Sequence, residues 1–201
     1  MVMASGLPAP ALRCIQAAIL VAVLAVPLPA TAQNLDVAAL RAQAASGDAN
    51  AEFQLGTLLY VGLDVIQDYI GAADWLKRAA DQGNADAQCE LGFLFQTGSF
   101  AQGPPPPDPK SALPWYEKAA AQHNGCGNYA LAHLYNTGIG VDADSDHAAK
   151  LFHLAQAEGF NAPAGAYPLQ ALQDHFYALA YQFAGSGAWS DTVSVKVGGG
   201  G

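Results

Sequence analysis

Apolar positions along the chain recur in a fixed order, and three short segments carry the pattern. Residues 55–62 (LGTLLYVG), 91–98 (LGFLFQTG) and 131–138 (LAHLYNTG) align without gaps. Each begins with a leucine followed by glycine or alanine and ends with glycine, and the leucines are 36 and 40 residues apart. Self-similarity at such a period indicates a repeat protein in which each copy is one supersecondary unit.

A second aligned block follows each of the first, so that each copy predicts two helices. The block reads DYIGAADWLKRAADQGN in copy one, DPKSALPWYEKAAAQHN in copy two and DSDHAAKLFHLAQAEGF in copy three. A half copy, LDVAALRAQAASGD, precedes the first. We expect first helices at about 49–60, 85–96 and 126–136, and second helices at about 69–82, 109–122 and 145–158.

Residues at the ends of these segments support the helix boundaries. An aspartate precedes each second helix and can accept hydrogen bonds from its first amides. A glycine closes each first helix, where a left-handed residue is favoured. Second helices close with glycine or, in copy two, with a histidine. The aspartates are Asp68, Asp108 and Asp144, the first glycines Gly62, Gly98 and Gly138, and the second-helix residues Gly83, His123 and Gly159.

A glycine inside an apolar helix costs about 1 kcal/mol relative to alanine. Because it recurs in register, we interpret it as a packing device that removes a side chain where the partner helix crosses, with Trp and Leu side chains buried around it. The alanine pairs 79–80 and 119–120 would serve the same purpose from the other side. The structural positions of the repeat are Leu55, Gly56, Trp75, Leu91, Gly92, Trp115, Leu131 and Ala132.

These combined motifs resemble the Sel-1-like repeat family, which is related to tetratricopeptide repeats. ADAQCELGFLF carries the first half of the family pattern, YNTGIGVDAD the middle and AADWLKRAADQG the last part, and the resemblance covers about residues 35–160. It departs at Leu59 and Leu151, which replace aromatic residues, and at four extra residues in copy two. The resemblance implies an all-α, right-handed superhelical solenoid of about three and a half helix pairs, with a concave face used in protein–protein interaction.

The chain beyond the repeats predicts one more helix. In residues 168–185 the apolar positions Leu169, Leu172, Phe176, Leu179 and Phe183 form a single helical stripe. We expect this helix to cap the last pair, because a repeat array needs a closing element with a polar outer face. Residues 186–201, rich in small residues and ending in glycines, are predicted to be a flexible tail.

The first 32 residues have the pattern of a secretory signal peptide. Arg13 precedes the apolar run CIQAAILVAVLAV, which leads into PLPATAQ with predicted cleavage after Ala32. The alternative is an uncleaved anchor, but a spanning helix needs about 20 apolar residues. We therefore expect a periplasmic or secreted protein with no membrane span after cleavage, and a repeat domain at residues 33–185.

Composition narrows the class of partner. Of 201 residues, 52% are hydrophobic and 12% charged, which is too apolar for a disordered chain. The net charge is −9, and the predicted cleavage would remove one further positive charge. Nucleic acids and anionic membranes attract basic patches, so we expect neither as a partner. A protein or peptide remains the expected partner.

The inner surface of related superhelices is formed by the first helix of each pair, which predicts a binding groove. A groove of aromatic and amide side chains suits an extended peptide or a partner's helix. The alternative is that some of the rings are core, and Phe93 is the strongest case. The candidates are Phe53, Thr57, Tyr60, Phe93, Gln96, Tyr129, His133 and Asn136.

Cys89 and Cys126 fall on the same face of neighbouring first helices. Helix axes at 8–10 Å would allow a disulfide if the Cα atoms lie within about 7 Å. The sequence leaves open a disulfide and two buried thiols. No metal site or cofactor is expected. Residues 142–147 (DADSDH) lack the glycine and glutamate of a calcium loop, and the histidines show no ligand spacing.

No catalytic motif is present in the sequence, so we expect a binding protein and not an enzyme. The main hypothesis is an exported scaffold for protein–protein interaction in the cell envelope. One alternative is a β-lactam-binding or hydrolysing envelope protein, since cysteine-rich relatives are linked with that chemistry. A second is a structural spacer in a larger assembly, favoured if the C-terminal helix covers the concave face. The insertion GPPPPDP (103–109) is interpreted as a stiff spacer or a docking strip.

Overall fold

The structure is a computed structural model that describes residues 35–99, 108–162 and 167–185. Its helices lie in one compact unit, Asn34–Gly201. The predicted signal peptide, the tail 186–201 and all but the end of the proline insertion fall outside the described residues. The helices are α2 (Val37–Ala45), α3 (Ala49–Val61), α4 (Tyr69–Asp81), α5 (Ala85–Thr97), α6 (Pro109–Ala121), α7 (Gly125–Thr137), α8 (Ser145–Ala157) and α9 (Pro168–Phe183).

The helix boundaries agree with the predicted ones to within a residue or two, and their caps explain why. The carboxylates of Asp68, Asp108 and Asp144 accept hydrogen bonds from the amides three residues later, at the starts of α4, α6 and α8. The glycines after α3, α5 and α7 are left-handed, with φ of 78°, 73° and 70°. His123 takes a φ of 58° where the other second helices are followed by glycine.

The helices of each pair cross at the glycine of the first helix. A Cβ added at Gly56 would lie 2.7 Å from Cγ of Leu76, and one at Gly92 would lie 2.7 Å from Cε1 of Tyr116. The glycines therefore make room for the partner helix, as predicted. A leucine fills the space at Gly56, as predicted, but the tyrosine at Gly92 was not predicted. The predicted tryptophans, Trp75 and Trp115, are only half-buried.

We expect Gly92→Ala to destabilise the protein by up to about 2 kcal/mol. Overpacking a buried site costs about 1–3 kcal/mol, and replacing a helical glycine returns about 1 kcal/mol of that. The ring of Tyr116 cannot retreat freely, because it is fully buried and its hydroxyl donates to Oε1 of Gln96 over 2.7 Å. Urea unfolding monitored by circular dichroism would measure the change. A variant more stable than the parent would contradict this packing role.

A buried polar contact joins the two helices of every pair at equivalent positions. Gln82 donates to Oε2 of Glu52 at 2.6 Å in the first pair, and Gln122 donates to Oε1 of Gln88 at 2.8 Å in the second. In the third pair the roles are exchanged, because the side-chain amide of Asn128 on α7 donates to the carboxylate of Glu158 after α8. Each contact satisfies a buried polar group that would otherwise destabilise the pair.

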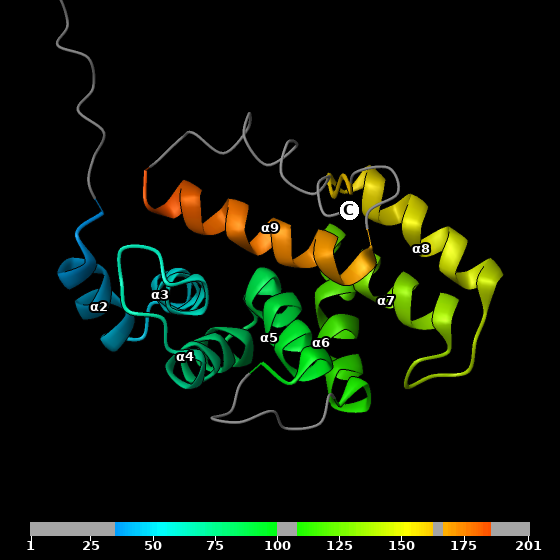
Figure 1. Ribbon diagram of the computed structural model, residues 1–201, viewed down its shortest axis with the longest axis horizontal. Coiled ribbons are helices and arrows are strands. Elements are labelled where there is room, and N and C mark those ends of the chain that lie inside the picture. The colour runs from blue at the N-terminus through cyan, green and yellow to red at the C-terminus, as the bar shows by residue number, and fades with distance from the viewer. Residues whose placement is uncertain (1–34, 100–107, 163–166, 186–201) are drawn as a thin grey trace, which may run out of the picture. The chain divides into compact units, whose positions relative to one another are not determined.

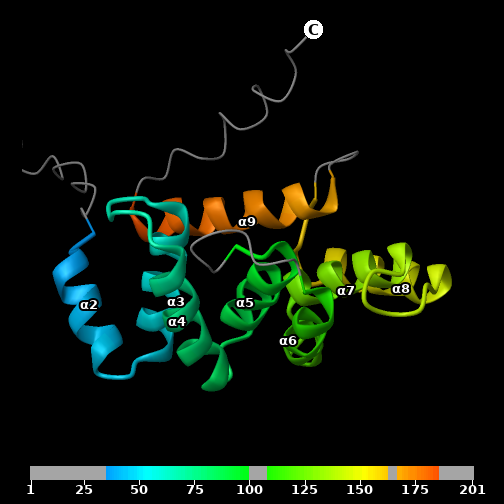
Figure 2. The same ribbon diagram turned by 60° about the horizontal axis from the view of Figure 1, so that its bottom comes forward.

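Successive pairs stack so that each element contacts the next, from α2 through α8. The first helices α3, α5 and α7 also contact one another directly and form a row. Helix α9 lies along this row and contacts all three of them (Figures 1 and 2). The predicted cap on the last pair is therefore placed differently: α9 packs on the first helices of all three pairs, with its Phe176 and Phe183 against Phe93 and Phe53.

Candidate binding face

The inner face is the side of α3, α5 and α7 that the sequence predicted as a groove. Helical spacing places the predicted residues on one side of each helix, as expected. Seven of the eight are buried, however, so they do not line an open groove in the described part of the chain. The buried residues are Phe53, Thr57, Tyr60, Phe93, Gln96, Tyr129 and His133, while Asn136 is exposed.

Helix α9 accounts for much of this burial. The ring of Phe53 lies 5.5 Å from that of Phe183, and the ring of Phe93 lies 5.3 Å from that of Phe176, both edge to face. Such aromatic pairs each contribute about 0.5–1.5 kcal/mol beyond the area they bury. The inner face therefore binds an amphipathic helix, and in this chain that helix is its own.

The third repeat extends the same aromatic surface beyond α7. Tyr129 packs against Phe152 of α8 and Phe160, with ring centroids 5.4 Å and 4.6 Å apart. Phe160 in turn lies 5.1 Å from the ring of His175 on α9. Burial lowers the pKa of His175, although Asp86 nearby opposes that shift. The aromatic contacts thus run from α8 to α9 without a break.

Some predicted groove residues serve the repeat itself. Gln96 accepts the hydrogen bond from Tyr116 and so belongs to the α5–α6 contact. Oγ1 of Thr57 lies 3.0 Å from the carbonyl oxygen of Phe53 and 2.6 Å from Oε2 of Glu90, so its single proton is shared between two acceptors. His133 is buried enough that its pKa is lowered. These three side chains are buried in the structure, with α9 in place.

Glu90 is the functional candidate that sequence reasoning missed. It lies on α5, is fully buried, and burial raises the pKa of its carboxyl to about 8. The corresponding positions of the other repeats hold Gln54 and Ala130. A carboxylate that breaks the repeat pattern at a position flanked by buried residues was the available signal.

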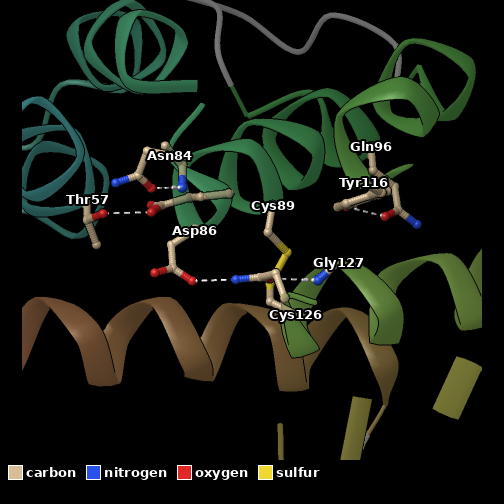
Figure 3. Close-up of a disulfide and its surroundings, with 11 residues drawn as sticks. Thr57, Asn84, Asp86, Cys89, Gln96, Tyr116, Cys126 and Gly127 are labelled. Carbon is tan, nitrogen blue, oxygen red and sulfur yellow. Dashed lines mark hydrogen bonds between the residues drawn. A yellow bond between two sulfur atoms is a disulfide. The ribbon is translucent and has the colours of Figure 1, made fainter. Parts of the chain in front are cut away.

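Cys89 and Cys126 form a disulfide between α5 and α7, with their Cα atoms 6.1 Å apart (Figure 3). The sequence left this state and two free thiols open. Both residues are buried. Beside the bridge, the side-chain amide of Asn124 donates to Asp86 at 2.7 Å, which also ties the start of α7 to α5. The bridge therefore fixes the spacing of two helices of the inner row.

Two shallow hollows open beside the third pair, and they share Phe160. One encloses about 170 Å³ and the other about 110 Å³. Both are small beside the 300–1,000 Å³ of most ligand pockets. The first is lined by Tyr129, Phe152, Gln156, Phe160, Asn161 and Ala162, and the second by Asp86, Asn124, Gly125, Cys126, Glu158, Gly159, Phe160 and His175.

The acidic run at residues 142–147 lies at the start of a helix. Asp144 caps α8, as proposed for the acidic run at 142–147. Within residues 35–99, 108–162 and 167–185, no group of three or more His, Cys, Asp or Glu side chains is arranged to hold a metal ion. In the same part of the chain, no helix has both the length and the apolar character needed to cross a membrane.

Comparison with known proteins gives one family and a common fold. The family model described as Sel1 repeat matches residues 49–84, 85–124 and 127–160. A Sel1 repeat protein from Oxalobacter formigenes has a crystal structure that aligns with a TM-score of 0.53 at 31% identity, covering 69% of this chain and 98% of that one. The protective antigen c5321 of uropathogenic Escherichia coli, described as displaying an SLR fold, aligns with a TM-score of 0.56 at 27% identity, covering 76% and 33%.

A curated relative extends the comparison to a much longer protein. Chitin synthase regulatory factor 3 of Schizosaccharomyces pombe is 35% identical over 86 residues, which is 43% of this chain. The match spans only 9% of that protein's length. Sel1 repeat proteins generally mediate protein–protein interaction. Since the three matched repeats coincide with the pairs α3–α4, α5–α6 and α7–α8, the chain belongs to the Sel1 repeat family and has its α-solenoid fold.

Proposed function

We propose that this chain is an exported Sel1 repeat scaffold that binds a protein partner in the cell envelope, and that the partner occupies the inner face of α3, α5 and α7. The observation that carries the proposal is that this face already holds an amphipathic helix, α9. Export rests on the signal-peptide pattern of residues 1–32. The absence of basic patches in the sequence favours a protein over a nucleic acid.

Because α9 covers the face, a partner must displace it. A face that is free for only a fraction of the time binds with an affinity reduced by that fraction. Variants that loosen α9 should therefore bind a partner more tightly. Variants that remove contact residues from the inner face should bind the partner more weakly.

Phe53 and Phe183 allow this idea to be tested from both sides of one contact. Phe183→Ala removes the ring on α9, and Phe53→Ala removes the ring on the face, so the two variants lose the same pairing. We expect Phe183→Ala to raise partner affinity by about tenfold. Phe53→Ala should bind the partner more weakly than Phe183→Ala does, because it loosens α9 in the same way but also removes a ring that the partner would contact. The measurement is quantitative capture from an envelope extract by immobilised residues 33–201, followed by titration of whichever protein is retained.

The same experiment decides the second candidate function, a structural spacer in a larger assembly. Coverage of the inner face by α9 is the observation that favours a spacer. A spacer would use its outer or end surfaces, so both variants would retain partners equally well. Equal retention would therefore overturn binding at the inner face. A β-lactam function gains no support from the three matched proteins named above, none of which is described in such terms.

A further inference from the structure

Glu90 is a buried carboxyl that is only partly satisfied. Its Oε2 accepts the hydroxyl of Thr57 at 2.6 Å, whereas its Oε1 has no hydrogen-bond partner among the described residues. The side chain is wholly inaccessible to solvent. An unpaired charge in such a place is strongly unfavourable, so the group stays neutral or gains access to water.

Tyr60 connects this carboxyl to α9. Its ring lies 6.2 Å from that of Phe93, on the same helix as Glu90, and Phe93 packs against Phe176 of α9 at 5.3 Å. Burial raises the pKa of the Tyr60 hydroxyl, so it remains protonated while Glu90 titrates. Glu90 therefore lies one helical turn from Phe93, the residue of α5 that packs on α9.

No cation offsets an ionised Glu90 among the groups recorded around it. Its own helix supplies Asp86, whose negative charge opposes ionisation. Helix α3 supplies Thr57 and Tyr60, α4 supplies Tyr69 next to Tyr60, and α9 supplies Tyr177. His175 of α9 lies near Asp86, and burial lowers its pKa, which favours the neutral ring.

We propose that Glu90 is a pH-sensitive latch for α9: protonated, it holds α9 on the inner face, and ionised, it favours release of α9 and opening of that face. The proposal rests on the proposed function of the inner face and adds a means of regulating it. An exported protein meets the pH of its surroundings directly. The latch would therefore make partner access depend on external pH.

Release of α9 is the easiest way to bring water to Glu90. Helices α3, α5 and α7 are each packed between neighbours in the array, and the disulfide joins α5 to α7. Helix α9 packs on α3, α5 and α7 through buried residues that include Leu172, Phe176 and Ala180. Its release would uncover the face of α5 that carries Phe93, one helical turn from Glu90.

The direction of the effect follows from proton linkage. Closure with Glu90 buried raises the carboxyl pKa from 4.5 to about 8, so the closed state binds the proton more tightly than the open state does. The equilibrium constant for release of α9 should therefore increase about tenfold for each pH unit between about 5 and 8, and it should become constant above that range. Helix α9 therefore covers the inner face most firmly at low pH.

Hydrogen–deuterium exchange by mass spectrometry measures this opening without any partner. Exchange rates of α9 peptides, corrected for the intrinsic effect of pH, should rise about tenfold per pH unit up to about 8 in the parent. Glu90→Gln should remove this slope, and Gln54 in the first repeat indicates that the position accepts an amide. Peptides from α6 should show no slope in either protein. Because no partner is present, the outcome is independent of whether binding at the inner face is found.

A second variant guards against poor folding of the first. The bond from Thr57 lowers the Glu90 pKa, so Thr57→Val should move the pH at which opening levels off to a higher value. The latch is overturned if exchange of α9 in the parent does not depend on pH, or if the dependence survives Glu90→Gln. It is also overturned if α6 shows an equal dependence, or if Thr57→Val does not change the pH at which exchange becomes constant.

Discussion

Reduction of the Cys89–Cys126 disulfide is expected to lower the free energy of unfolding by about 3–4 kcal/mol. The bridge joins residues 37 positions apart, and closing a loop of that length removes much of the conformational freedom of the unfolded chain. The effect acts through α5 and α7, which form the middle and end of the inner row. Urea unfolding of the same protein with and without a reductant measures it.

This comparison needs no substitution, so it avoids the cavity that Cys→Ala would leave. Both cysteines are buried, and the reduced thiols can remain in place as small apolar groups. The circular dichroism spectrum before unfolding provides the control for intact helices. A difference below about 1 kcal/mol would show that the bridge contributes little beyond what packing already provides.

Arg78→Ala should destabilise the protein by about 3 kcal/mol, because it leaves a buried carboxylate without its counter-ion. Arg78 lies 2.6 Å from Oε1 of Glu52, which is completely buried, and its guanidinium stacks over Trp75 at 4.4 Å. The lower end of the usual range applies because the arginine is itself about half exposed, at 49%.

The second repeat supplies a matched control. Lys118 occupies the equivalent place, with its ammonium 4.1 Å from the ring of Trp115, but the residue corresponding to Glu52 is the neutral Gln88. Lys118→Ala should therefore cost less than about 1 kcal/mol, the value of an exposed cation–π contact. Adding Glu52→Gln to Arg78→Ala should recover most of the loss. Equal costs at the two positions would rule out the buried carboxylate as the cause.

The repeat made much of the fold predictable from sequence. Asp68, Asp108 and Asp144 define where second helices begin, and Gly62, Gly98 and Gly138 define where first helices end. These signals are local and occur three times, so each copy checks the others. The close approach of the two helices at Gly56 and Gly92 was predictable for the same reason, although the residue opposite the glycine is Leu76 or Tyr116 and not the tryptophan.

The binding face was harder to predict because burial depends on the whole chain. Helical spacing placed Phe53 and Phe93 on one face correctly, but nothing within the repeats indicates what lies opposite them. The stripe on α9 was visible in the sequence, and its amphipathic pattern fits either the end of the array or its inner row. Only the three-dimensional complementarity of Phe176 and Phe183 with the row distinguishes the two.

The contact of α9 with α3 also has a consequence for how the chain folds. An open array has only neighbouring contacts, so its pairs can form locally and quickly, and its ends can fray independently. The pairing of Phe53 with Phe183 instead joins the first repeat to the last helix. Because α9 follows the repeats in the chain, it is synthesised after them, and until then their apolar inner face is uncovered. During that interval the uncovered inner face can bind amphipathic helices of other proteins.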